Sequence, residues 1–300
     1  MERHEIEVFL TLAEQLHFRR TGEHLGLAHG RVSQIVAKLE RRIGAPLFER
    51  TSRSVALTPI GEQLRDQLGP AYRAVQDAIA DAIAAGKGIR GALRVGFSSP
   101  WCNEIVLAAA EIFRARYPEC VVRIQEIQLH DPFGPLRAGE LDLQLSEFPV
   151  IEPDLRTGAV IFTEQRALLV PSGHRLAQQD SVSMEDMADA PLLVVDGDIP
   201  QHWMDAIFPA RTPAGLPITH VAAAVYWQEI LTMVAAGRGV STVSLRARHF
   251  FQRPGLAYVP VRDGPPIRYG LTWRRNCETA RIRAFADIVV GLAPEFAEQK

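Results

Sequence analysis

The stretch "LGLAHGRVSQIVAKLERRIG", residues 25–44, alternates polar and apolar residues in a way that decides the local fold. Polar side chains recur at steps of three, four and three residues, at Arg31, Gln34, Lys38 and Arg41. Apolar side chains recur with a similar spacing between these polar positions, at Val32, Ile35, Val36, Leu39 and Ile43. Because residues three or four apart share one side of an α-helix, the sequence predicts an amphipathic helix over 29–43.

Two shorter helices are predicted ahead of this one, since apolar residues also recur at helical spacing over 6–16 and 18–25. Only "GLA" separates the second helix from the third, so the two must cross steeply, as in a helix-turn-helix. We expect Gly26 to allow the tight turn and Leu27 to fill the space between the helices. Gly44 is expected to end the third helix, because glycine adopts the left-handed cap at little cost.

The third helix carries side chains suited to reading DNA, and the B-DNA major groove, about 12 Å wide, admits one α-helix. Arg31 could bind guanine or a phosphate, Gln34 could pair with adenine, and Lys38 is long enough to reach the sugar-phosphate backbone. His29 and Ser33 lie beside them. A solvated basic face without a DNA partner would produce the same pattern, and this alternative stays open at this point.

Overall composition does not mark the chain as a nucleic-acid binder, because the net charge is −2 over 300 residues. Residues 31–53 nevertheless carry six Lys or Arg against two Asp or Glu, a local positive excess. A hydrophobic content of 47% is ample for two or three folded units. The N-terminus lacks the apolar run of a secretory signal, and no segment has the roughly 18 apolar residues of a membrane span. We therefore expect a cytoplasmic protein without a membrane partner.

The sequence offers little for redox, metal or catalytic chemistry. Cys102, Cys120 and Cys277 are odd in number and widely spaced, which predicts buried thiols and neither a disulfide framework nor a metal site. Cys102, beside a candidate ligand loop, is the one to test for redox chemistry. The G-x-S-x-G elbow, a Gly-rich phosphate loop and H-E-x-x-H are all missing, and the nine His are scattered. We predict no enzyme, no metal and no cofactor.

Residues 9–64, "FLTLAEQLHFRRTGEHLGLAHGRVSQIVAKLERRIGAPLFERTSRSVALTPIGEQL", resemble the N-terminus of LysR-type transcriptional regulators. The resemblance covers about sixty residues and is carried by "GEHL", "VSQIVAKLE", "RIGAPLFER" and "LTPIG" in register. It implies a winged helix-turn-helix whose third helix enters the major groove of promoter DNA and whose two-stranded wing contacts the flanking backbone. The implied wing strands are 47–49 and 55–57, with Arg50 and Arg53 directed toward DNA.

The chain departs from the commonest family pattern, which opens the third helix with Ser-Gln-Pro where this one has Ala28, His29 and Gly30. Serine would cap the free N–H groups of the first turn and proline would stiffen it, whereas alanine is a poor cap and glycine costs entropy. We expect the opening turn to fray without DNA. The base preference of commoner members therefore does not carry over to this chain.

A long helix is predicted after the wing, because Thr58 is a good N-cap and Pro59 suits the first helical position. Apolar residues then alternate at steps of four and three, the spacing of a coiled-coil seam. A helix between two domains has little to bury within its own chain, so we expect the seam to pair with a second copy through Leu64, Leu68, Val75 and Ile79. Pro70 predicts a kink or local break. Residues 84–91, "AAGKGIRG", are expected to form a flexible connector.

From residue 91 onward, strand-like runs alternate with helical ones, which is typical of parallel α/β units. Some two hundred residues in this style resemble the family's effector-binding region, built as two periplasmic-binding-protein-like lobes. The predicted fold is therefore α/β and multidomain. Its expected boundaries are 1–58 for the DNA-binding domain, 59–90 for the linker helix and hinge, and 91–300 for the effector domain. We expect the first lobe at 91–161 plus 267–300 and the second at 162–266, joined by crossover strands near 161–168 and 267–271.

The loop "SSPWCN", residues 98–103, is the candidate effector site, because it follows a strand and opens a helix. The hydroxyls of Ser98 and Ser99 and the free N–H groups could hold a carboxylate at the positive helix end, with Trp101 as an aromatic wall. A helix-capping serine beside a packing Trp is the alternative. We expect an anionic, carboxylate-bearing effector. Across the cleft it would face Gln128, His130, Asp196, Trp203, Trp227 and Thr242.

These observations predict a LysR-type transcriptional regulator that binds promoter DNA and is controlled by a small-molecule effector. It is expected to act as a homodimer, or as a homotetramer built from two dimers, and to contact RNA polymerase if it activates transcription. A solute-binding module whose N-terminal helices serve only for dimerisation is the alternative from another class. An enzyme is the third interpretation.

Overall fold

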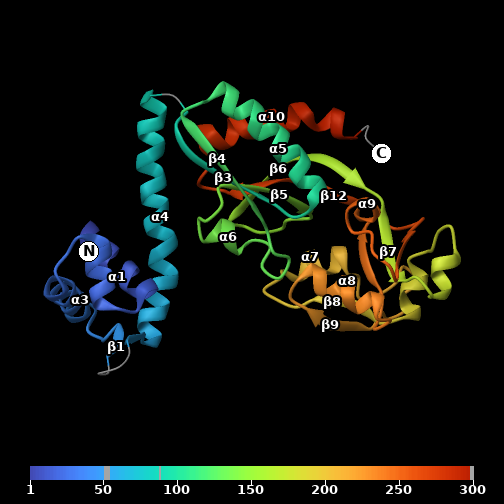
Figure 1. Cartoon of the computed structure of the whole chain (residues 1–300), viewed down its shortest axis with the longest axis horizontal. Coiled ribbons are helices and arrows are strands. Elements are labelled where there is room, and N and C mark those ends of the chain that lie inside the picture. The colour runs from blue at the N-terminus through green and yellow to red at the C-terminus, as the bar shows by residue number, and fades with distance from the viewer. Residues whose placement is uncertain (51–54, 88, 298–300) are drawn as a thin grey trace. The chain divides into compact units, whose positions relative to one another are not determined.

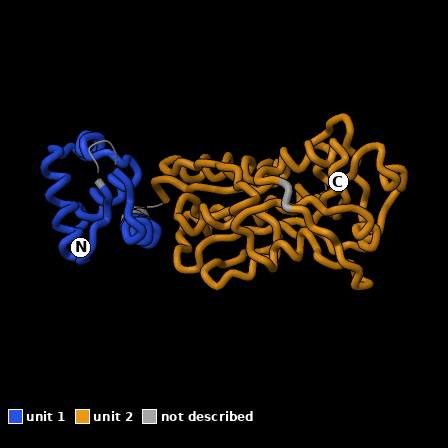
Figure 2. The backbone as a smooth tube through the Cα atoms, turned by 90° about the horizontal axis from the view of Figure 1, so that it is seen from below, with its two compact units in different colours: residues 1–80 blue, residues 81–300 orange. Residues whose placement is uncertain are grey.

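The computed structural model describes residues 1–50, 55–87 and 89–297. The chain divides into two compact units, Met1–Ala80 and Asp81–Lys300, which Figure 2 shows in blue and orange. The division falls inside the long helix and not at residue 58, because much of that helix packs on the N-terminal unit.

The first unit contains the three predicted helices, α1 (Arg3–Gln15), α2 (Phe18–Leu25) and α3 (His29–Ile43) (Figure 1). Two short strands follow, β1 (Phe48–Arg50) and β2 (Val55–Leu57), and they pair antiparallel with Phe48 opposite Leu57. Helix α3 spans the predicted residues, and β2 matches its prediction. Strand β1 begins one residue later than predicted, because its pairing register starts at Phe48.

The core of this unit is made by one side of α3 packed on α1. Residues Val32, Ile35, Val36 and Leu39 of α3 are buried against an apolar cluster from α1, α2 and the start of β1. Each such side chain contributes about 1.5–3 kcal/mol of burial free energy. Ile43, predicted on the same side, is 39% exposed because it lies in the last turn, beyond this cluster. The tight α2–α3 turn needs Gly22, since a Cβ there would lie 2.5 Å from the Leu27 carbonyl oxygen.

A buried carboxylate also ties α1 to α3. The Glu5 side chain is 0% exposed, and its oxygens lie 2.9 Å from Lys38 Nζ and 2.9 Å from Arg42 Nη1. Hydrogen bonding from Lys38 is the largest cause that lowers the pKa of Glu5 to about 2. The Glu2 backbone N–H donates to the same carboxylate at 2.9 Å. Nothing in the apolar spacing of the sequence indicated that Glu5 would be buried.

The wing is fixed to the helices on both of its sides. Glu40 Oε1 accepts hydrogen bonds from the backbone N–H groups of Leu47 and Phe48, at 2.9 and 3.3 Å. Thr58 acts as the predicted N-cap, since its Oγ1 accepts from Gly61 N at 3.0 Å and donates to Pro46 O at 2.8 Å. A Cβ on Gly61 would lie 2.1 Å from the Leu47 carbonyl oxygen, so the "LTPIG" glycine permits this close approach.

Helix α4 (Pro59–Lys87) continues through Pro70, so the predicted local break is wrong, while the alternative of a kink stays a prediction. Residues 84–87 belong to this helix and not to a flexible connector. Tertiary contacts on both sides of Pro70 offset its missing N–H. Leu64 and Leu68 pack on the core of the first unit, and the Tyr72 hydroxyl donates to Glu7 Oε1 at 2.6 Å.

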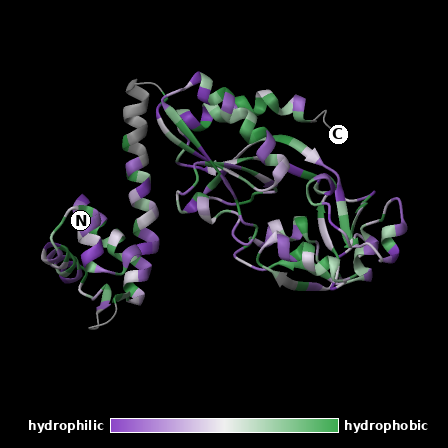
Figure 3. Cartoon of the chain, viewed as in Figure 1, coloured by the Kyte–Doolittle hydropathy of each residue, from purple (hydrophilic) through white to green (hydrophobic). Residues whose placement is uncertain are grey.

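The first lobe of the second unit is a five-stranded sheet in the order β4-β3-β5-β12-β6. Its strands are β3 (Gly91–Phe97), β4 (Cys120–Glu126), β5 (Leu143–Phe148), β6 (Leu155–Glu164) and β12 (Ile267–Arg274). Helices α5 (Pro100–Arg116) and α10 (Ala280–Ala297) carry both hydrophobic and hydrophilic residues (Figure 3) and bury Phe113 and Phe285 in the core. A short helix, α6 (Gly134–Arg137), follows β4.

The second lobe contains β7 (Arg166–Pro171), β10 (Ser241–Ser244) and β11 (Leu256–Pro260), with β7 antiparallel to both neighbours. Strands β8 (Leu192–Val195) and β9 (His220–Ala224) pair in parallel, and a parallel bridge joins Leu192 to Val240. The helices are α7 (Gln201–Ile207), α8 (Trp227–Ala235) and α9 (Ala247–Phe250), with 3-10 turns at Arg175–Gln178 and Glu185–Asp189.

The prediction of parallel units holds for β3, β4 and β5 and for β8 with β9, but not for the rest. Strand β12 is antiparallel to β5 and β6, because it enters the first sheet on its return from the second lobe. The chain crosses between the lobes at β6 to β7 and at β11 to β12, as the two predicted crossovers require. Among the residues with described structure, no helix is long and apolar enough to cross a membrane.

The missing side chain at Gly30 leads to a stability prediction. A Cβ at Gly30 would meet nothing within 4 Å, so Gly30→Ala should raise the free energy of unfolding of the first unit by up to about 1 kcal/mol. Gly26→Ala is the matched control, since it has equal space but φ +66°, and it should lower stability by about 1 kcal/mol. Hydrogen exchange of α3 amides in urea measures both. Equal effects of the two variants would contradict this account.

The buried Glu5 carboxylate predicts a pH dependence. A folded-state pKa of about 2 against a usual 4.5 means that Glu5 stabilises the fold fully above pH 4.5 and loses this effect as the pH falls toward 2. Glu5→Gln should therefore be less stable than the wild-type chain at pH 6, and the gap should close on acidification. Amide protection of α1 and α3, compared between both chains at each pH, measures the gap. A gap independent of pH would argue against a charged Glu5.

Candidate DNA-binding surface and ligand cleft

The outward side of α3 presents the residues predicted to read DNA. His29, Arg31 and Gln34 are exposed, and Ser33 is half-buried beside them. Arg31 and Gln34 have no ion pair or hydrogen bond to any other side chain that the structure describes. The opposite side of the helix is buried in the core. These two side chains are therefore available to a partner from outside the unit.

Lys38 does not share this arrangement. Its ammonium lies 2.9 Å from Glu5 Oε1, toward α1, because the buried carboxylate needs a counter-charge. The Lys38 side chain is nevertheless 51% exposed, so its predicted reach to the DNA backbone stays a prediction. Of the two wing arginines, Arg50 ends β1 but its side chain lies outside the description. Arg53 lies outside the described residues altogether.

The start of α3 shows the expected weak capping. Ala28 is the N-cap residue with extended backbone, and it makes no side-chain hydrogen bond to the first turn. The His29 ring instead lies edge-on to Phe18, with ring centroids 6.0 Å apart. The first turn of α3 thus has backbone hydrogen bonds to Ala28 O and this aromatic contact, but no capping side chain.

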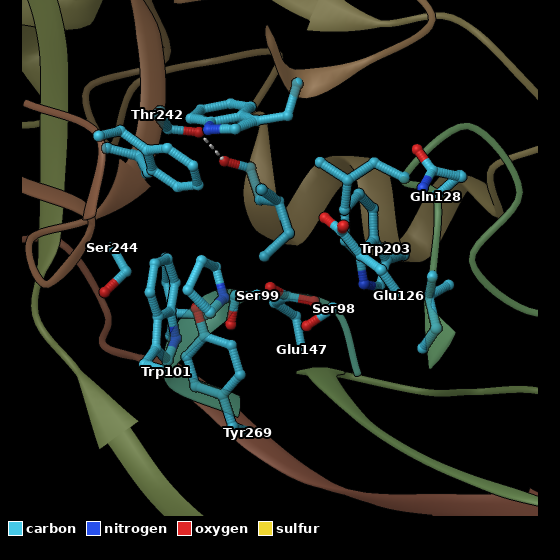
Figure 4. Close-up of a pocket in the computed structure, with 18 of the residues that line it drawn as sticks. Ser98, Ser99, Trp101, Glu126, Gln128, Glu147, Trp203, Thr242, Ser244 and Tyr269 are labelled. Carbon is cyan, nitrogen blue, oxygen red and sulfur yellow. Dashed lines mark hydrogen bonds between the residues drawn. The ribbon is translucent and has the colours of Figure 1, made fainter. Parts of the chain in front are cut away.

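A cleft between the two lobes of the second unit holds about 700 Å³ of empty space, open solvent at its mouth included. From the first lobe, Ser98, Ser99, Trp101 and Gln128 line it, as predicted. From the second lobe, the predicted lining residues are Trp203, Trp227 and Thr242. Figure 4 shows most of these side chains gathered around one space.

His130 and Asp196 do not line this cleft. The His130 ring packs edge-on against Tyr226, with centroids 5.5 Å apart. Asp196 is exposed, and its backbone N–H donates to Ala224 O at 2.9 Å. The His130 turn closes on Gly197, where a Cβ would lie 2.1 Å from the His130 carbonyl oxygen. The two predicted residues thus belong to a backbone contact beside the cleft.

The loop that opens α5 is held by backbone and by hydroxyl contacts. Ser99 is the N-cap of α5, but its side chain makes no capping hydrogen bond, so the alternative of a helix-capping serine is not supported. Ser98 N–H donates to Leu145 O at 3.2 Å, which fixes the loop on β5. On the facing wall, Thr242 Oγ1 donates to Ile207 O at 2.6 Å (dashed in Figure 4).

Sequence reasoning missed the acidic residues of the cleft. Glu147, on β5, and Glu126, at the end of β4, both line it, together with Tyr269 and Ser244. Glu147 is 9% exposed, and burial raises its pKa, against the opposing effect of the Ser98 and Tyr269 hydroxyls. Glu147 is one of two acids in "LDLQLSEF", where three Leu residues alternate with polar ones up to Ser146, and this was the available signal. No Lys, Arg or His is found among the described residues that line the cleft, so the expected carboxylate effector lacks a counter-charge.

The cysteines do not support redox chemistry at the cleft. Cys102 is fully buried in α5, and burial, with a smaller effect of Glu147, raises the pKa of its thiol. A thiol held in this neutral form is a poor nucleophile toward oxidants. All three cysteines are free. Within the described part of the chain, no group of three or more His, Cys, Asp or Glu could hold a metal ion.

Comparison with known proteins gives matches along nearly the whole chain. The family model "LysR substrate binding domain" matches residues 86–293, and the model "Bacterial regulatory helix-turn-helix protein, lysR family" matches residues 4–62. A curated relative, "Uncharacterized HTH-type transcriptional regulator YnfL" of Escherichia coli K12, is 29% identical over 287 residues, 93% of this chain and 94% of its own length.

Two solved structures share the fold. A full-length OxyR point variant from Pseudomonas aeruginosa has a TM-score of 0.64 at 24% identity, covering 96% of this chain and 94% of that one. Full-length CbnR complexed with its target DNA has a TM-score of 0.68 at 18% identity, covering 96% of this chain and 99% of that one. Since the substrate-binding-domain model alone matches more than half of the chain, this protein belongs to the LysR family of DNA-binding transcriptional regulators, which have an effector-binding domain and are not enzymes.

Proposed function

We propose that α3 enters the major groove of promoter DNA, with Arg31 and Gln34 on base edges and His29 and Ser33 beside them. This proposal rests on the difference between the two sides of α3. Arg31 and Gln34 are exposed and have no side-chain partner among the described residues, whereas Val32 is 0% exposed. Such a helix can dock without disturbing the core of its unit. The similarity to CbnR, a protein solved with its target DNA, supports the same docking mode.

The wing completes the proposed contact. Glu40 and Thr58 hold the wing strands rigidly on α3 and α4. Arg50 is the last residue of β1, and Arg53 precedes β2 by two positions in the sequence. We assign both arginines to flanking phosphates, where they fix the register of the protein on the duplex and do not select bases.

We infer that the C-terminal part of α4 joins two copies of the chain. Val75 and Ile79 are 54% and 50% exposed, four residues apart on one side of the helix, which is the spacing of a helix-pairing seam. Leu64 and Leu68, predicted for the same seam, instead pack on the core of their own unit. The proposed self-contact therefore lies beyond Pro70. A dimer formed there presents two α3 helices, and two dimers would give a tetramer.

The cleft between the lobes is the proposed effector site. A small molecule that binds the closed lobes more tightly than the open ones shifts the equilibrium between them, and this changes the affinity or geometry of DNA binding by linkage. We place this regulator in the cytoplasm, with promoter access. As an activator it would also contact RNA polymerase.

Replacement of Arg31 tests the DNA contact. Arg31→Ala should weaken binding to the chain's own promoter region by about 1–3 kcal/mol if Arg31 contacts a base. Arg123→Ala, on an exposed position of β4, is the matched control and should change nothing. Quantitative footprinting at two salt concentrations measures both, with affinity falling steeply as salt rises. An unchanged footprint for Arg31→Ala would remove Arg31 from the interface.

Charges placed on the proposed seam test self-association. The double variant Val75→Glu and Ile79→Glu should convert oligomers to monomers and weaken promoter binding, because two half-sites are no longer bound together. Ile60→Glu, also on α4 at a position 46% exposed, should leave the mass unchanged. Sedimentation velocity measures the mass. Oligomers that persist in the double variant would show that another surface joins the copies.

A further inference from the structure

The cleft holds two carboxyl groups and, among the described residues that line it, no basic side chain. Glu147 is nine-tenths buried and has no ion pair with any side chain that the structure describes. Glu126, at the exposed end of β4, adds a second carboxylate at the same space. Burial raises the pKa of Glu147 and so favours its neutral form, whereas a cation bound beside it would favour the charged carboxylate.

The position of Glu147 also explains why an anion is disfavoured. The N-terminus of α5 is positive, and in isolation it would attract a carboxylate. Figure 4 shows the Glu147 side chain beside Ser98, in the loop that precedes α5. The protein's own carboxylate thus occupies the surroundings that an acidic ligand would need. A second carboxylate brought to this place would meet a like charge in a buried setting.

Two arginines near the cleft wall, Arg166 and Arg246, already bind other groups of the protein. Arg166 is buried, and its Nη1 and Nη2 donate to the carbonyl oxygens of Ile207 and Ala206, each at 2.7 Å. Arg246 pairs with Glu104 at 3.0 Å and with Glu164 at 3.3 Å. Neither residue lines the cleft. Neither of these two arginines therefore forms an ion pair with Glu147.

Aromatic side chains form the walls on both sides. Three of the four Trp of the chain line the cleft, Trp101 from the first lobe and Trp203 and Trp227 from the second. Trp101 is held edge-on to Tyr269, with centroids 6.1 Å apart, and Trp227 to Phe251 at 6.5 Å. The faces of such rings attract organic cations, most strongly for Trp. A buried acid surrounded by aromatic rings is the chemistry that selects an ammonium group.

We propose that the effector of this chain is a small organic cation, a protonated amine or a quaternary ammonium. Its charge lies against Glu147 and its carbon skeleton lies among Trp101, Trp203 and Trp227. This inference rests on the proposed function of the cleft as the effector site. Because Glu147 belongs to one lobe and two of the Trp to the other, a cation between them favours the closed arrangement.

Three probes of one shape and different charge test the proposal on the full-length protein at pH 7. They are 2-phenylethylammonium, 2-phenylethanol and 3-phenylpropanoate, and titration calorimetry measures their binding. The ammonium should bind about tenfold or more tighter than the alcohol, which corresponds to one charge-assisted contact. The carboxylate should not bind. Glu147→Gln should reduce the ammonium affinity about tenfold or more and leave the alcohol affinity unchanged.

Glu111→Gln, at an exposed position of α5 that does not line the cleft, is the matched control. Its exposed charge is screened by salt, so the variant should change the ammonium affinity by less than about threefold. Glutamine at 147 keeps the side-chain size, and an unchanged urea midpoint shows that the variant folds. The charge preference of the wild-type chain tests the proposal independently of any variant.

Three results would overturn the cation assignment: no binding of the ammonium, a carboxylate that binds as tightly, or an ammonium affinity that survives Glu147→Gln. Promoter binding separates this inference from the proposed function. A carboxylate that binds and alters promoter affinity would leave the effector role standing and remove the cation. An ammonium that binds with the expected selectivity but leaves promoter affinity unaltered would keep the cation and remove the effector role.

Discussion

The N-terminal unit depends on how firmly α3 is held from behind. Its apolar side is buried against α1, Glu5 joins α1 to Lys38 and Arg42, and Glu40 carries the wing. Lys38 and Arg42 thus pair with a buried carboxylate on α1, while Arg31 and Gln34 have no side-chain partner among the described residues. Rigid support behind a recognition helix is what allows a few exposed side chains to act at defined positions.

Some of the contacts that support α3 could be predicted from the sequence, and others could not. The spacing of Val32, Ile35, Val36 and Leu39 predicted the α3 core, because burial follows helical periodicity directly. The N-cap role of Thr58 was equally readable from local chemistry. Glu5 and Lys38 were not, since an ion pair between separate helices leaves no periodic trace in either one. The local break predicted at Pro70 was wrong, because helix propensity takes no account of the packing of Leu64 and Leu68 on the core.

In the effector domain the sequence identified the loop and several walls of the cleft but not its charge. Ser98, Trp101, Trp203, Trp227 and Thr242 were predicted from their places at strand ends and on the facing lobe. Glu147 lies within a strand, where side chains alternate between the two faces of the sheet. Its orientation toward the cleft could not be predicted without knowledge of the sheet register. The family assignment sets aside the alternative of a solute-binding module without DNA binding. It leaves the chemistry of the ligand to the residues of this chain.

The return of the chain from the second lobe has a consequence for biosynthesis. Strand β12 lies between β5 and β6 in the first sheet, although β6 precedes it by about a hundred residues. Until the ribosome has released residues 267–274, β6 has no neighbour in that sheet and α10 cannot cover it. The second lobe is complete in sequence earlier, so it can fold during translation while the first still awaits β12. Truncated nascent chains would thus expose a strand edge prone to aggregation.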